Sequence, residues 1–161
     1  MDESLTERLV ALLREHGAGF EVMTHEPVRT SEEAALVRRT PLEQGAKALV
    51  FNADGRVVLL VVQAHRRIET RAFKRAFGVK NLRMVSAGEL MDLTGLEVGA
   101  VPPFGSLMGL ATYVDERLLV LPRIAFNAGS RSTSVVMETR DYARLVQPAV
   151  GRFASDDEPE E

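Results

Sequence analysis

A lysine lies in apolar sequence where a charged side chain calls for an explanation. Lys47 sits within Gly45-Ala-Lys-Ala-Leu-Val50, at the start of an expected strand, and three of the 20 basic residues are lysines. A lysine where arginine is the usual base suggests a compact point charge. In a dry pocket, that charge could polarise a carbonyl group or bind a phosphate. Alternatively, its stem packs on apolar surface while the ammonium group reaches water, and spacing alone leaves both open.

Two glycine-containing segments could present backbone N–H groups to a ligand. Residues 99–105 combine two prolines with two glycines, and a second segment reads Phe126-Asn-Ala-Gly129. Successive N–H groups in such segments can form anion-binding nests or oxyanion donors. Considered alone, each segment is better explained as a turn, which glycine favours. The Asn127 side chain could bond its own turn or a substrate.

A basic stretch follows the expected central strand. Between residues 66 and 83, seven bases stand against one acid, Glu69. The bases are Arg66, Arg67, Arg71, Lys74, Arg75, Lys80 and Arg83. This excess favours contact with a phosphate backbone, whereas the alternative is an exposed helix face that serves solubility. Phe73 and Phe77, four residues apart, are expected to anchor this helix to the core rather than stack on bases.

Several reaction classes are disfavoured by what the sequence lacks. It has no cysteine, which excludes disulfides, thiolate zinc sites and a cysteine nucleophile. The sequence motifs of phosphate-binding loops, dinucleotide-binding domains, serine hydrolases and zinc proteases are absent as well. The three histidines, His16, His25 and His65, are scattered along the chain. We therefore expect no metal site and no cofactor.

Composition and charge indicate a single domain in the cytoplasm. The chain has 161 residues, 45% of them hydrophobic, and a net charge of −3. We expect one domain over residues 1–150 and a disordered tail over residues 151–161, since five of the last six residues are acidic. The longest apolar stretch, residues 57–62, is far shorter than a membrane span of about 18 residues. We expect neither membrane association nor export.

The elements that must position these residues follow from local patterns. Ser4, Thr30 and Ser86 begin capping boxes and predict helices over residues 4–16, 30–38 and 86–94. Helices are also expected at residues 70–77 and 141–146. Strands are expected at residues 20–24, 46–52, 56–63, 82–85, 110–114, 118–121, 124–126 and 133–138, the second and third forming a hairpin. The third, apolar on both faces, should be central and buried.

These elements predict an α/β fold of the α+β type, with a mixed, barrel-like β-sheet surrounded by short helices. Several blocks, taken in order, also resemble one known family. They are His25-Glu-Pro-Val28, Thr30-Ser-Glu-Glu-Ala-Ala35, residues 41–50, Arg83-Met-Val-Ser86, Leu93-Thr-Gly95, residues 99–105 and Phe126-Asn-Ala-Gly129. Together they resemble the YbaK family, relatives of the editing domain inserted in bacterial prolyl-tRNA synthetase, over residues 20–148.

The resemblance implies an aminoacyl-tRNA deacylase that hydrolyses the ester at the 3′ end of mischarged tRNA in trans. The family's functional lysine corresponds to Lys47. The implied substrate-binding positions are Thr30, Gly99, Val101, Pro102, Pro103, Phe104, Gly105, Asn127, Ala128, Gly129 and Ser130. Ala100 stands where many relatives have a second glycine. Ser130 stands where some relatives have histidine, so we do not expect a histidine-assisted mechanism.

Mischarged tRNA is the expected partner, as the substrate, and an aminoacyl-tRNA synthetase is a further candidate partner that the sequence leaves open. The expected tRNA contacts come from the basic stretch: Arg66, Arg67, Arg71, Lys74, Arg75 and Lys80. Two other functions remain alternatives at this point. The chain could be a non-catalytic module that binds tRNA or a nucleotide in the same pocket, or a hydrolase of a small acyl or nucleotide ester. The motifs assign neither the amino acid removed nor the oligomeric state.

Overall fold

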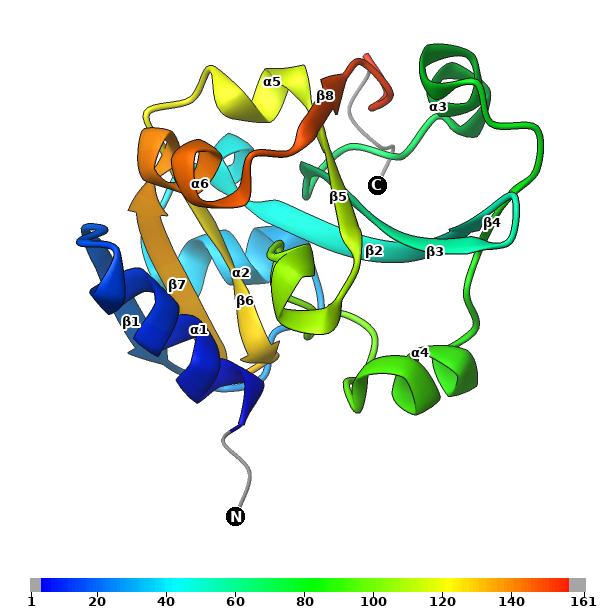
Figure 1. Ribbon diagram of the computed structural model, residues 1–161. Coiled ribbons are helices and arrows are strands. Elements are labelled where there is room, and N and C mark those ends of the chain that lie inside the picture. Colours follow the sequence, from blue (N-terminus) through cyan, green and yellow to red (C-terminus); the bar gives the residue numbers. More distant parts are fainter. Residues whose placement is uncertain (1–3, 157–161) are drawn as a thin grey trace.

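Two β-sheets and six α-helices form a mixed α/β fold over residues 4–156, the part of the chain that this computed structural model describes (Figure 1). The strands are β1 (Phe20–Thr24), β2 (Ala46–Ala53), β3 (Arg56–Gln63), β4 (Leu82–Met84), β5 (Ala111–Asp115), β6 (Arg123–Ser130), β7 (Thr133–Glu138) and β8 (Ala149–Gly151). The α-helices are α1 (Leu5–Glu15), α2 (Ser31–Arg38), α3 (Thr70–Phe77), α4 (Ala87–Thr94), α5 (Glu116–Leu119) and α6 (Thr139–Val146). Two short 3-10 helices are η1 (Leu42–Gln44) and η2 (Gly105–Met108).

The strands are arranged in a five-stranded sheet of order β4-β2-β3-β5-β8 and a three-stranded sheet of order β1-β7-β6. β3 pairs antiparallel with β2 and parallel with β5, and its residues 58–62 are at most 2% exposed. This confirms the prediction of a buried central strand. The two sheets meet at a bridge between Gly45 and Ala125. Within residues 4–156 their hydrogen-bond ladders form two open sheets and no closed barrel.

Local hydrogen bonds define the helix starts and the β2–β3 turn. The hydroxyl groups of Ser4, Thr30 and Ser86 each accept the N–H of the residue three positions later, at 3.1 Å. The three expected helix starts are therefore confirmed. In the expected hairpin, Asp54 and Gly55 both have positive φ, at 51° and 88°, as the favoured two-residue turn requires.

Two hydrophobic clusters lie on opposite faces of the five-stranded sheet. Alternation along β2 directs Ala48 and Val50 to the larger cluster, which also contains side chains from the three-stranded sheet, α1 and α6. The smaller cluster lies beneath α3, where the ring of Phe73 is 4.9 Å from that of Phe77 and 5.2 Å from that of Phe153. The predicted anchoring of this helix to the core is confirmed.

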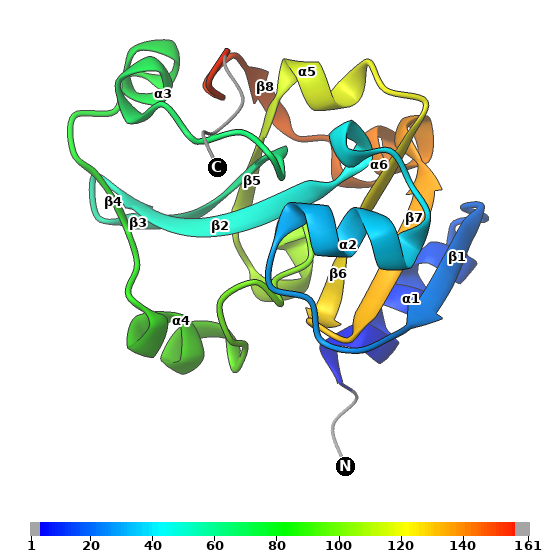
Figure 2. The ribbon, with the colours of Figure 1, turned by 180° about the vertical axis from the view of Figure 1, so that it is seen from behind.

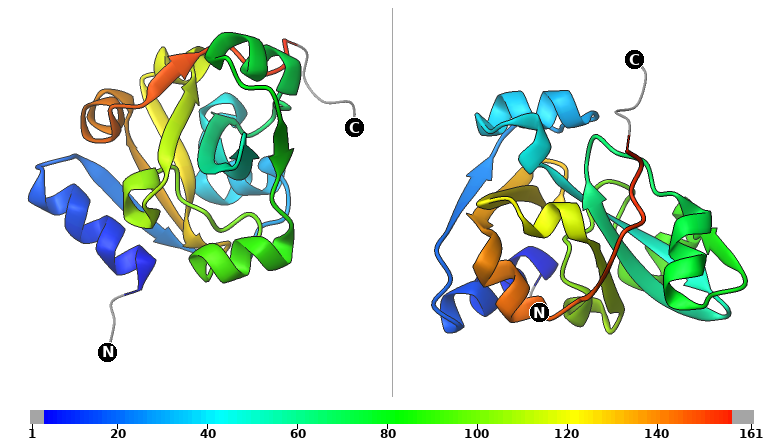
Figure 3. Two further views of the ribbon diagram at one scale, coloured as in Figure 1. Left: turned by 45° about the vertical axis from the view of Figure 1, so that its right-hand side comes forward. Right: turned by 90° about the horizontal axis from the view of Figure 1, so that it is seen from above.

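The helices cover the sheets from several sides. α1 and α2 lie on opposite faces of the three-stranded sheet, as the front view and the reverse view show (Figures 1 and 2). α3 and α4 flank β4 at one end of the five-stranded sheet (Figure 3). None of the helices within residues 4–156 is long and apolar enough to span a bilayer.

Two predictions around β6 were wrong. Residues 118–121 were expected as a strand, but residues 118 and 119 belong to α5 and residues 120 and 121 follow it, because Asp115 caps that helix by accepting the Arg117 N–H at 2.9 Å. Strand β6 continues to Ser130, so the Asn-Ala-Gly segment lies in a strand rather than in a turn. The register with β7 shifts between Asn127 and Ser130, and Gly129 has a φ of 99° there. This bulge combines strand pairing with a locally bent backbone.

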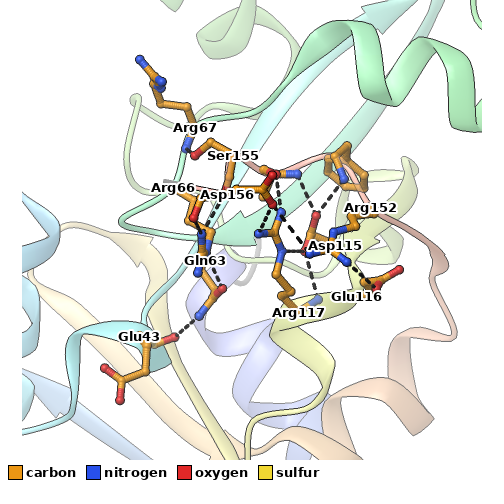
Figure 4. Close-up of polar contacts among 12 residues, drawn as sticks. Glu43, Gln63, Arg66, Arg67, Asp115, Glu116, Arg117, Arg152, Ser155 and Asp156 are labelled. Atoms are coloured by element: carbon orange, nitrogen blue, oxygen red, sulfur yellow. Dashed lines mark hydrogen bonds and ion pairs between the residues drawn. The ribbon is translucent and has the colours of Figure 1, made fainter. Parts of the chain in front are cut away.

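Polar contacts, two of them buried, hold the C-terminal segment against the sheet (Figure 4). The Asp115 carboxylate accepts the backbone N–H groups of Phe153 at 2.8 Å and Ala154 at 2.7 Å. Arg66 donates to the carbonyl oxygens of Ser155 at 2.7 Å and Asp156 at 2.8 Å. The expected domain boundary after residue 150 thus falls inside β8. Residues 157–161, most of the expected acidic tail, lie outside the described residues.

Replacing Asp115 by asparagine should destabilise the fold. The amide retains one acceptor oxygen, so some of the buried N–H groups that this carboxylate accepts would lose their partner. We expect Asp115→Asn to lower the free energy of unfolding, measured in urea, by about 2–3 kcal/mol. Asp92→Asn on the exposed surface of α4 is the control and should change it by less than about 0.5 kcal/mol. Equal stability of the two variants would contradict this role of Asp115.

Candidate functional site

A pocket of about 410 Å³ lies between α2, β2, the loop before η2 and the end of β6. It brings together five of the residues that the sequence singled out. These are Thr30, Lys47, Gly99, Val101 and Asn127. They come from four segments that are far apart along the chain, so the convergence is a property of the tertiary structure.

The pocket wall is rich in positive charge. Arg29, Arg38, Lys47 and Arg131 line it, and within residues 4–156 no Asp or Glu does. Arg131 pairs with Glu97 at 3.2 Å, whereas Arg38 and Lys47 form no ion pair with the described residues. No group of three His, Asp or Glu side chains in the described part of the chain could hold a metal ion. Such a wall suits an anionic ligand or a developing negative charge.

Lys47 lies on the part of β2 that does not pair with β4. β4 pairs with β2 only over residues 51–53, whereas Lys47 is in register with Val62 of β3 on the other side. Its side chain is half-buried, and this burial lowers the pKa of the ammonium group below its usual value. Nothing in residues 4–156 gives this group a hydrogen bond or an ion pair. The charge is therefore available to a ligand.

Arg38 is a second buried cation in the pocket wall, and the sequence analysis missed it. Its Nε donates to Ser134 Oγ and its Nη2 to Asn127 Oδ1, both at 2.9 Å. Burial lowers the pKa of the guanidinium to about 10. Both oxygens are neutral, so no acid in the described residues cancels the charge. Ala34 and Arg38, four residues apart, share the buried face of α2, and this spacing was the available signal.

The Asn127 side chain connects Arg38 to the glycine-proline loop. Since a guanidinium group only donates hydrogen bonds, it turns the amide oxygen of Asn127 toward itself. The amide nitrogen is then directed to the loop and donates to the Gly99 carbonyl at 2.7 Å. The N–H of Gly129 makes a second connection, to the Ala100 carbonyl at 2.8 Å. Together these bonds attach the loop to the bulged end of β6.

Four predicted site residues lie behind the pocket wall. Pro102, Pro103, Phe104 and Gly105 are buried and do not line the cavity. The carbonyl of Pro103 accepts the Tyr142 hydroxyl at 2.7 Å, and the Gly105 N–H donates to Thr112 Oγ1 at 3.0 Å. A Cβ atom at Gly105 would lie 2.2 Å from that same oxygen, so only glycine fits. These residues support the loop from beneath.

The remaining members of the predicted site face α1 and the β6–β7 turn. The Ala128 carbonyl accepts the Thr6 hydroxyl, and Ser130 Oγ lies 3.2 Å from Thr133 Oγ1. Thr30 has two roles. It lines the pocket, and its hydroxyl group caps α2 by accepting the Glu33 N–H. The structure therefore separates the predicted residues into a group at the pocket, a group that supports the loop and a group at the strand end.

The residues of the basic stretch have different surroundings in the structure. Arg66 is engaged by the C-terminal backbone and by Gln63 at 2.8 Å, which gives it a structural role. Exposed side chains are those of Arg67, Arg71, Arg75 and Lys80, and Lys74 is half-buried. Arg83 pairs with Glu89 through two bonds of 2.9 and 3.0 Å. The cations that remain available lie on α3 or in the segments that flank it. Helix α3 itself lies beside the sheet end that carries β4 (Figure 3).

Comparisons with known proteins agree with this arrangement. A model of the aminoacyl-tRNA editing domain matches residues 25–145. The multifunctional Ser/Thr-tRNA deacylase ProXp-y of Escherichia coli strain K12 is 38% identical over 152 residues, which cover 91% of each chain. A segment of 76 residues, 47% of this chain, is 29% identical to 13% of the proline–tRNA ligase of Staphylococcus saprophyticus. A solved structure, described as a candidate trans-editing enzyme for prolyl-tRNA synthetase, has a TM-score of 0.83 at 26% identity and covers 96% of this chain and 99% of its own.

The two uncancelled cations predict that the pocket prefers a phosphate ester to its uncharged counterpart. Adenosine 5′-monophosphate should raise the melting temperature more than adenosine does, since only the nucleotide binds to positive charge. Arg38→Met and Lys47→Met should each weaken nucleotide binding on the order of tenfold. Arg123→Met, at an exposed position at the start of β6, should leave it unchanged. Equal shifts with both compounds would contradict an anion-binding pocket.

Proposed function

Because the chain belongs to the aminoacyl-tRNA editing family, we propose that it hydrolyses the ester between a wrong amino acid and the 3′ end of tRNA. It acts in trans, as a deacylase that supports translational fidelity. The observation that carries the proposal is the convergence of Lys47, Arg38 and the Gly99 segment in a pocket lined by no acid of the described residues. Since a relative with 38% identity is named a Ser/Thr-tRNA deacylase, seryl and threonyl esters are the first substrates to test.

The reaction depends on positioning and charge more than on a strong protein nucleophile. Water attacks the ester carbonyl and forms a tetrahedral oxyanion, and the bond from that carbon to the ribose oxygen then breaks. The amino acid leaves with the water oxygen, and the ribose oxygen takes up a proton. Lys47 stabilises the oxyanion or holds the terminal phosphate. The described pocket wall offers no carboxylate or imidazole as a base, so the free ribose hydroxyl of the substrate assists the water.

The surface around α3 receives the acceptor stem of the tRNA. The side chains in this role are Arg67, Arg71, Lys74, Arg75 and Lys80. Phosphate contacts of this kind guide association and become weaker with salt. Arg66 supports this surface indirectly, because it fastens the C-terminal segment beside Arg67.

The same proposal covers the domain bounds, the architecture, the partner and the location. The editing domain proposed for residues 1–150 extends to the packed residues up to 155. The two sheets, joined at Gly45 and Ala125, act as a partly open barrel with the pocket at its rim. An aminoacyl-tRNA synthetase is a candidate partner, and the cytoplasm is the expected location, since both supply charged tRNA.

Removing the Lys47 ammonium group should abolish most of the deacylation. Lys47→Ala should lower kcat/KM for a mischarged seryl- or threonyl-tRNA on the order of 100- to 1000-fold, as expected for a group that stabilises developing charge. The measurement is release of labelled amino acid, with Arg123→Ala as a control outside the pocket. Wild-type rates in Lys47→Ala would rule out this role. Tight tRNA binding with no release by the parent protein would favour the non-catalytic module.

Neutralising three bases of α3 should weaken tRNA use without changing the chemistry. The triple variant Arg71→Gln, Lys74→Gln, Arg75→Gln should raise KM about tenfold at moderate salt and keep kcat. The salt dependence of kcat/KM should lose about one unit of logarithmic slope per phosphate contact removed. The charge-matched control is a triple variant in which Arg14, Arg123 and Arg140 are replaced by glutamine. These three residues lie on the side of the three-stranded sheet. Unchanged KM and slope in the α3 variant would favour a small-ester hydrolase.

A further inference from the structure

A second cavity, of about 400 Å³, continues from the pocket across the surface of the five-stranded sheet. The two cavities share Lys47 and Leu49 of β2. From there the second one passes Leu82 and Met84 of β4 and reaches Arg67 and Thr70 at the start of α3. We call it the β4 groove. It connects the pocket with the basic surface around α3, so a ligand that occupies both must cross it.

The β4 groove combines an apolar floor with a cation at each end. Leu49, Leu82 and Met84 contribute to the floor, and Met84 is 51% exposed, so its side chain is open to a ligand. Lys47 lies at the pocket end and Arg67 at the far end, and neither forms an ion pair with the described residues. Apolar surface between two available cations matches a flat base flanked by phosphates.

Arg83 also borders the β4 groove, but its charge is already neutralised. Its guanidinium donates to both carboxylate oxygens of Glu89 and lowers the pKa of that acid to about 2. Both groups are therefore ionised over the physiological pH range, and they pair with each other. Apart from the Thr70 hydroxyl at the far end, the groove lining within residues 4–156 has no uncharged polar side chain that could read a base edge, so the groove suits the shape and charge of a nucleotide rather than the identity of its base.

We propose that the β4 groove binds the nucleotide that precedes the aminoacylated one at the 3′ end of the tRNA. The inference rests on the proposed function, which puts the terminal nucleotide and its ester in the pocket. The 3′ end of tRNA is single-stranded, so its bases are free to lie against protein side chains. The preceding base lies on Met84 and Leu82, Lys47 contacts the phosphate that links the two nucleotides, and Arg67 contacts the next phosphate. Continuity with the pocket favours this occupant over an unrelated protein partner.

The test compares a long and a short substrate in a matched pair of variants. Met84→Asp places a negative charge on the floor of the groove, and Met91→Asp does the same on α4, where Met91 is 49% exposed and outside the groove. The substrates are an aminoacyl-tRNA and the corresponding 3′-aminoacyl-adenosine, which has no preceding nucleotide. We expect Met84→Asp to lower kcat/KM for the tRNA about tenfold or more. Its rate with aminoacyl-adenosine and both rates of Met91→Asp should match the parent protein.

Arg67→Ala tests the far end of the groove without altering the floor. It should lower kcat/KM for the tRNA alone, with a shallower salt dependence. A tRNA rate of Met84→Asp equal to that of the parent would overturn the inference and leave the proposed function standing. An equal loss on both substrates would also overturn it, since it would indicate a structural effect. Failure of the parent to hydrolyse either substrate would reject the proposed function itself.

Discussion

The hydrogen bonds between the buried guanidinium of Arg38 and two neutral oxygens organise the pocket. Through Ser134 and Asn127 they join α2 to β7 and β6, and the Asn127 amide extends the connection to the Gly99 carbonyl. Because arginine has no acceptor, it determines which way the asparagine amide points. A carboxylate partner would have held α2 equally well, but it would have cancelled the charge. Because Ser134 and Asn127 are neutral, Arg38 connects the three elements and still leaves the pocket wall positively charged.

That positive wall is costly for folding. Moving Lys47 and Arg38 out of water lowers the pKa of both groups, and the same desolvation opposes burial of the charged forms. Hydrophobic burial elsewhere offsets this cost. The side chains on the two faces of β3, for example, pack into two separate hydrophobic clusters. A polyanionic substrate that enters the pocket would relieve the same penalty. The chemistry proposed for the site therefore uses charges that have no acidic partner among the described residues.

Strand alternation relates the pocket to the surface beyond it. On β2, Lys47, Leu49 and Phe51 point to one side of the sheet, while Ala48 and Val50 point into the larger core. The first two therefore belong to both cavities, and Phe51 continues the row toward β4. β4 covers only the far end of β2, which leaves the Lys47 end of the strand free for a ligand. One strand thus aligns Lys47, the group proposed for catalysis, with the apolar floor next to it.

The sequence by itself determined the features that depend on neighbours within a few positions. Capping hydroxyls, the Asp54-Gly55 turn and the doubly apolar central strand have local signatures, and each was confirmed. The family resemblance, carried by blocks spread along most of the chain, was confirmed as well. Lys47 was singled out because its flanking residues made a charge there unusual. Only the tertiary structure showed that Arg38 joins the pocket and that Arg66 serves the C-terminal segment. Those roles depend on partners about 90 residues away in sequence, at Ser134, Asn127 and Ser155. The spacing of Ala34 and Arg38 indicates that Arg38 faces the interior, but spacing within one helix does not determine which distant residues folding brings to it.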